Sequence, residues 1–235
     1  MVLNLIKITI FLLSLSLVAS CVVEDTTSNE TGETEEIAIE LQEQPNKSFS
    51  LKKLQSTDIG SNLYFELTGS DSIGNSYTGS IRGVNREKIE KYGMEVTPFE
   101  TMLSLNNGEL ALSVNSITYT DENGYLISSV VPNDNLICIP STPDKLPDFV
   151  KSRDFGMQST LICNNETIVD RNWEADLVFG DSIDITLYET TKNSNNSIIT
   201  TVYIEYTIDI TGEITSIRTQ TTDVYNHFTL SLSSK

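Results

Sequence analysis

The stretch VYIEYTIDITG, residues 202–212, alternates apolar and polar side chains and then ends in a turn. Its apolar positions are Val202, Ile204, Tyr206 and Ile208. An alternation of period two with one apolar face is typical of a strand in an antiparallel sheet that is covered on one side. The stretch therefore predicts a strand that runs into a hairpin.

The turn that closes this stretch, Asp209-Ile-Thr-Gly212, has the pattern Asp-x-x-Gly, which recurs at Asp71 and at Asp121. An aspartate at the first turn position can accept backbone N–H groups, and a glycine at the fourth can take a positive φ. Carboxylates at such tips could also bind calcium, but no stretch has the complete ligand spacing of an EF-hand. The pattern thus predicts hairpin turns, and no metal site.

Similar alternation marks strands along most of the chain. The predicted strands are 62–68, 76–84, 95–105, 109–120, 125–131, 157–163, 167–179, 182–191, 198–208, 214–224 and 227–233. Short helical turns are predicted only at 86–93 and 144–152, and a bulge between Val114 and Ile117. We expect an all-β fold, an antiparallel β-sandwich or half-barrel built from hairpin meanders, with two similar lobes as a further alternative.

The N-terminal residues have the features of an export signal. Lys7 precedes the apolar run ITIFLLSLSLV, residues 8–18, which has the length of a signal-peptide core. A membrane-spanning helix needs about 20 apolar residues. The motif Val18-Ala19-Ser20-Cys21 resembles the lipobox of bacterial lipoproteins.

That resemblance implies cleavage before Cys21, with a diacylglyceryl group on its sulfur and an acyl group on its new amino terminus. Val22 rather than Asp follows the cysteine, which by the same resemblance favours the outer membrane. The alternative is an ordinary signal cleaved near Ala19, which leaves Cys21 as a thiol. We expect a signal peptide over 1–20, a lipidated cysteine with an acidic linker over 21–48, and a β-rich domain over 49–235.

The net charge of −18 excludes one class of partner. Binding to nucleic acid needs clustered Lys and Arg, and the chain has 15 of these against 33 acids. Eight acids and one base lie in residues 22–47, a segment without aromatic residues. Such a composition is typical of a disordered spacer.

Two cysteines, Cys138 and Cys163, remain once Cys21 is set aside, and both follow Leu-Ile. An even remainder in an exported protein predicts one disulfide. The alternative is a pair of buried thiols. No Cys-x-x-Cys spacing indicates a redox pair.

Catalytic motifs are missing from the sequence. His227 is the only histidine, and there is no Gly-x-Ser-x-Gly elbow, phosphate loop or dinucleotide fingerprint. We therefore expect no catalytic residue, no metal and no cofactor. Trp173 and Tyr203 form the candidate ligand surface, although a lone tryptophan in a β domain more often fills the core. Polar-face or edge positions are also predicted for Tyr64, Tyr77, Tyr119 and Tyr188.

These observations favour a lipoprotein of the cell envelope, anchored to the membrane through Cys21, whose β domain is non-catalytic and serves binding or structure. The expected partner is an unknown envelope protein or glycan. One alternative is a carrier or chaperone for lipid or lipoprotein with an apolar cavity. A second is an envelope polysaccharide hydrolase, which needs two carboxylates facing each other across a cleft.

Overall fold

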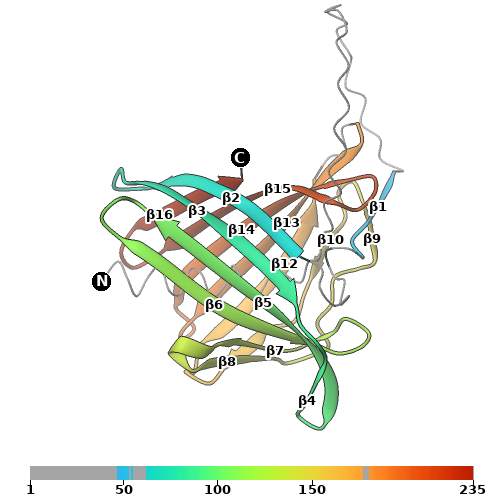
Figure 1. Ribbon diagram of the computed structural model, residues 1–235. Coiled ribbons are helices and arrows are strands. Elements are labelled where there is room, and N and C mark those ends of the chain that lie inside the picture. The colour runs from blue at the N-terminus through green and yellow to red at the C-terminus, as the bar shows by residue number, and fades with distance from the viewer. Residues whose placement is uncertain (1–46, 53, 55–61, 177–179, 235) are drawn as a thin grey trace, which may run out of the picture.

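The computed structural model describes residues 47–52, 54, 62–176 and 180–234, and over these the chain is all-β (Figure 1). Twelve antiparallel strands form a closed barrel, because β12 pairs with β11 on one edge and with β13 on the other. The order around the barrel is β12-β11-β8-β7-β6-β5-β3-β2-β16-β15-β14-β13. The strands are β2 (Asn62–Asp71), β3 (Ser76–Asn85), β5 (Met94–Asn106), β6 (Ala111–Thr120), β7 (Leu126–Val131), β8 (Leu136–Pro140), β11 (Leu161–Cys163), β12 (Ile168–Ala175), β13 (Ser182–Lys192), β14 (Ile198–Asp209), β15 (Ile214–Asp223) and β16 (Phe228–Ser234).

The predicted all-β fold of antiparallel hairpins is confirmed, and the sheet goes further than a half-barrel by closing on itself. The remaining strands are short: β1 (Ser48–Ser50) pairs with β9 (Phe149–Lys151), β4 (Ile89–Lys91) with β5, and β10 (Phe155–Met157) with β12. The only helical element in the described part of the chain is the 3₁₀ turn η1 (Pro132–Asp134).

The two predicted helical turns are wrong. Residues 86–93 form β4 and its turn onto β5, where Tyr92 and Gly93 take φ of 54° and 77°. Residues 144–152 contain β9, which pairs with β1. In both cases pairing with a neighbouring strand overrides the local helical preference.

Alternation places apolar side chains inside the barrel and polar side chains outside. Ile185, opposite Tyr206, and Leu187, opposite Ile204, are buried, whereas Tyr203 on the same wall faces outward. The apolar side chains of the core are at most 9% exposed, so they contact one another. Among the described residues, no helix is long and apolar enough to span a membrane.

The predicted bulge between Val114 and Ile117 is absent, since β6 pairs with β5 in continuous register from Ala111 to Thr120. A register shift occurs instead between β6 and β7, at Tyr119 and Thr120. Ser116 and Thr118 simply face inward and are 1% and 0% exposed. The barrel interior is therefore partly polar at this point. The bulge was predicted because only apolar side chains were assumed to face inward.

The Asp-x-x-Gly turns are hairpin turns, as predicted. In the turn from Asp71 to Asn75, Oδ1 of Asp71 accepts the N–H groups of Ile73 and Asn75 at 3.0 and 2.9 Å, and Gly74 has φ of 95°. The turns that start at Asp121 and Asp209 repeat these bonds. The carboxylates thus bind backbone N–H groups.

One end of the barrel is capped by β1 and β9, whose Phe49 and Val150 are buried (Figure 1, right). The turn between β14 and β15 lies against this cap. A Cβ added at Gly212 of this turn would lie 3.0 Å from the Ser50 carbonyl oxygen. We call this the capped end. The opposite end, where the β2–β3 turn lies, is the hairpin end.

A buried ion cluster fixes the segment between β8 and β9 to the barrel wall. Arg171, which points inward from β12, donates to Asp144 of this segment at 2.5 Å and to Glu189 of β13 at 3.0 Å. Burial disfavours the charged form of Arg171, but the two carboxylates outweigh it and raise the pKa of the guanidinium. All three groups are enclosed, so the cluster serves the fold.

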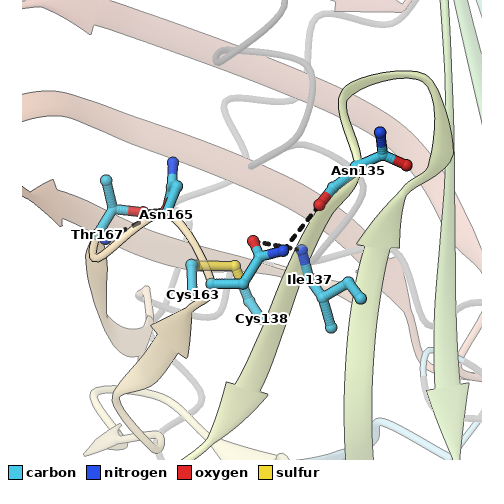
Figure 2. The surroundings of a disulfide bond; sticks show 7 residues. Asn135, Ile137, Cys138, Cys163, Asn165 and Thr167 are labelled. Carbon is cyan, nitrogen blue, oxygen red and sulfur yellow. Dashed lines mark hydrogen bonds between the residues drawn. A yellow bond between two sulfur atoms is a disulfide. The ribbon is translucent and has the colours of Figure 1, made fainter.

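The predicted disulfide between Cys138 and Cys163 is confirmed (Figure 2). The two residues lie opposite each other on β8 and β11, with Cα atoms 4.0 Å apart. The Asn164 side chain reinforces the link: its Oδ1 accepts the N–H of Ile137 at 3.1 Å and its amide donates to the Asn135 carbonyl at 2.8 Å. A cross-strand bond of this kind holds a short pair of strands in register.

Candidate functional site

A groove of about 470 Å³ lies on the outer face of the barrel, over β14, β15, β16 and β2. One wall carries large side chains, and the floor carries small ones. The wall residues are Tyr203, Glu205, Arg218 and Gln220, and the outward-facing floor residues are Thr68, Ser70, Ser231 and Ser233. We call this hollow the Tyr203 groove.

The aromatic part of the wall is braced from behind. Tyr203 lies opposite Tyr188 of β13, and their rings meet edge to face with centroids 5.3 Å apart. The Tyr188 hydroxyl donates to Glu174 on the next strand, β12. Each outward side chain is thus supported by the one on the neighbouring strand, which limits the rotation of the Tyr203 ring.

The polar part of the wall is centred on Glu205. Its Oε2 accepts the Tyr203 hydroxyl at 3.3 Å and its Oε1 accepts Nη1 of Arg218 at 3.1 Å. Burial raises the pKa of Tyr203; a hydrogen bond with Thr186 lowers it, and the Glu205 carboxylate raises it again, so that the net shift is upward. The phenol therefore stays protonated and remains a donor. The Arg218 side chain is 67% exposed and can reach a ligand.

The floor depends on a glycine. Gly69 of β2 lies opposite Leu232 of β16, and a Cβ at this position would lie 1.9 Å from the Ser231 carbonyl oxygen. The two strands therefore approach more closely than any side chain at position 69 would allow. Glycine kinks of this kind bend a sheet sharply enough to close a barrel.

A second hollow, of about 330 Å³, also lies where a glycine allows two strands to approach closely. Gly79 of β3 lies opposite Leu105, and a Cβ there would lie 1.9 Å from the Ser104 carbonyl oxygen. We call this hollow the Gly79 groove. Its lining holds only small or aliphatic side chains and Asn106, with no aromatic or charged residue.

The two residues of the candidate ligand surface lie on opposite faces of the wall. Tyr203 faces outward into the groove, whereas Trp173 lies opposite inward-facing Leu187 and packs against the core. Trp173 also supports β10, because a Cβ at Gly156 would lie 2.7 Å from its indole Nε1. Trp173 therefore fills part of the core, which is the alternative role predicted for it from the sequence.

The other tyrosines divide in the same way. Tyr64 faces outward and is 58% exposed. Tyr77 is buried inside the barrel, so its predicted polar-face position is wrong. Tyr119 lies on the outer face, between the inward-facing Thr118 and Thr120, and is buried there beneath the Lys91 ammonium, which is 3.6 Å from its ring centroid. The Tyr77 hydroxyl donates to Asp71 Oδ2 at 2.9 Å, which explains how a tyrosine in a polar-looking stretch is accommodated inside.

His227 and Cys21 are the remaining residues singled out in the sequence. His227 has φ of 50° and ends the turn between β15 and β16. No group of three or more His, Cys, Asp or Glu side chains that could hold a metal occurs within the described ranges. Cys21 lies outside the described residues.

Sequence reasoning missed Glu205, Arg218 and the floor of the groove. Strand alternation places these residues outside, but it does not say which strands are neighbours. Comparison of the chain with protein-family models, with curated proteins and with solved structures finds no match.

Proposed function

We propose that this chain is a lipoprotein of the bacterial cell envelope, anchored at Cys21 to the outer membrane, and that its barrel is a non-catalytic binding domain. We further propose that the ligand is an envelope glycan held in the Tyr203 groove. The observation that carries the proposal is the braced wall of Tyr203, Glu205 and Arg218 over a floor of hydroxyl groups. The disulfide supports export, since such bonds persist in oxidising compartments.

A glycan fits this groove better than a peptide does. The floor lies on the face of the sheet, where the backbone groups of β15, β16 and β2 are already used in the ladder. An extended peptide would need a free strand edge or apolar side pockets. A sugar needs an aromatic face and planar hydrogen-bonding groups, which Tyr203, Glu205, Arg218 and Gln220 supply. The net charge of −18 favours a neutral glycan over an acidic one.

The carrier alternative requires a large apolar cavity. Among the described residues, Ile81, Phe99 and Ile204, from three different strands, point inward, are at most 1% exposed and belong to one packed core. This packing favours an outer-face binding role over a lipid-carrying one.

A glycan array of neutral and acidic oligosaccharides, probed with the Cys21→Ser chain, tests the proposal. We expect binding to neutral glycans that falls at least about tenfold in Tyr203→Ala, equivalent to about 1.4 kcal/mol. Tyr64→Ala is the matched control, because Tyr64 is an exposed outward tyrosine outside the groove. Equal losses in the two variants, or no binding by the parent chain, would contradict the proposal.

A further inference from the structure

Strand β10 leaves one edge of the barrel wall uncovered. It pairs with β12 so that Gly156 lies opposite Trp173. Ala175 donates its N–H to the Asp154 carbonyl at 2.7 Å, and Gln158 donates its N–H to the Arg171 carbonyl at 2.9 Å.

Alternate residues of a strand direct their main-chain groups to opposite sides. Asp154, Gly156 and Gln158 face β12, so the N–H and C=O groups of Phe155 and Met157 point away from it. No strand pairs with this outer edge among the residues that the structure describes.

The side chains on this edge are also uncovered. Phe155 and Met157 are 82% and 83% exposed, more than any other large apolar side chain in the described part of the chain. Gly156, packed on the Trp173 indole, gives the strand a firm backing. Proteins usually protect an open edge with Lys, Pro or a bulge. Residues 155–157 contain none of these, which is typical of an edge that receives an added strand.

We propose that this edge binds residues 37–41 of the chain's own N-terminal segment as an added strand. In the sequence Ile37-Ala-Ile-Glu-Leu41, apolar side chains occupy alternate positions, which suits a strand with one face against Phe155 and Met157.

The connection to the barrel is short enough for this contact. Ser48 pairs with Lys151, only four residues before Phe155. Residues 42–46 can span about 17 Å when extended. The chain therefore enters the described structure beside the end of β9, four residues before Phe155 of β10.

The charges around the edge also match. Lys52, which lies over the Phe149 ring of β9, and Lys151 at the end of β9 are exposed, whereas Glu36, Glu40 and Glu43 accompany the apolar positions of the segment. Two nearby carboxylates are already engaged: Asp154 accepts the Lys151 N–H at 2.7 Å, and Glu174 accepts the Tyr188 hydroxyl. The docked segment covers an edge that would otherwise pair with another chain, and it shortens the spacer between Cys21 and the barrel.

Amide hydrogen exchange of the full mature chain, carrying Cys21→Ser, tests this contact. The measured variant combines Ile37→Asn, Ile39→Asn and Leu41→Asn, changes that lie outside the barrel. We expect the amides of Phe155 and Met157 to exchange at least about tenfold faster in this variant than in the parent. The amide of Gly156 reports folding and should be protected in both chains.

A control variant with Thr26→Asn, Thr27→Asn and Thr31→Asn should exchange like the parent. Equal exchange at Phe155 and Met157 in parent and test variant would overturn the proposal. Protection that increases with protein concentration would overturn it too, because it would assign the edge to a second copy. Protection that appears only when another protein is added would have the same effect.

Discussion

The Tyr203 groove and the Gly79 groove are hollows of one kind with different linings. Each lies where a glycine, Gly69 or Gly79, allows two strands to approach too closely for any side chain. Only the first has a wall of aromatic and charged residues. The comparison teaches that closing the barrel creates hollows on its outer face, and that ligand chemistry is a separate property supplied by neighbouring strands.

The largest expected effect tests the close approach of two strands at Gly69 and at Gly79, which both grooves share. Gly69→Ala and Gly79→Ala each place a Cβ against a backbone carbonyl, so we expect each to lower the free energy of unfolding by about 3 kcal/mol or more. Chemical denaturation measures this. Gly93→Ala is the control: nothing lies within 4 Å of a Cβ there, although its φ of 77° adds the smaller strain of a positive φ. If the three variants lost equal stability, the close approach would not be the cause.

The next effect concerns the β2–β3 hairpin, which joins the two grooves. Burial alone would raise the pKa of Asp71, but hydrogen bonds from Asn75, Tyr77 and Ile73 outweigh it and lower the pKa. We expect Asp71→Ala to cost about 2 kcal/mol, since it leaves these donors without an acceptor. Asp71→Asn should cost less, because Asn193 starts a turn with the same two backbone bonds.

The pH dependence follows from the sign of that shift. A lowered pKa in the folded state stabilises the protein above the ordinary pKa of about 3.9, and this stability is lost as the pH falls through the folded value. The parent should therefore exceed Asp71→Asn in melting temperature at neutral pH, and the gap should close below about pH 4. A gap that widens in acid would contradict the assignment.

The smallest expected effect tests whether the Tyr203 groove and the Gly79 groove differ in glycan binding. Glu205→Gln removes the charge that holds Arg218, and we expect it to weaken glycan binding about fivefold, near 1 kcal/mol. Asn106→Ala, in the Gly79 groove, should leave binding unchanged. Isothermal titration with the best glycan of the array measures both. A loss in Asn106→Ala that matched the loss in Glu205→Gln would remove the distinction between the grooves.

Much of the fold could be predicted from local sequence. The alternation at Val202–Ile208 gave strand and face correctly, and the Asp-x-x-Gly pattern gave the turns, because both depend on neighbours along the chain. Closure could not be predicted, since it rests on the long-range pairing of β2 with β16 and on Gly69, whose partner is 162 residues away in Ser231.

The candidate site could be predicted only in part from the sequence. The alternation along its own strand places Tyr203 on the outer face. For Trp173 the face follows only from the register of β12 with β13, which places the indole inside. Arg218 and Glu205 are 13 residues apart and meet only through the β14–β15 register. Asp144 and Arg171 are buried together, but the sequence does not predict this pair, because no periodicity marks the segment that carries Asp144.

The central claim is that the Tyr203 groove is the ligand site of this barrel. Backbone amide NMR of the Cys21→Ser chain, titrated with the best neutral oligosaccharide of the array, tests it most directly. We predict that the largest shifts fall at Tyr203, Gln220 and Ser231, with the Gly79 groove unchanged. Shifts centred on Gly79 and Ser104, or on β10, would contradict it.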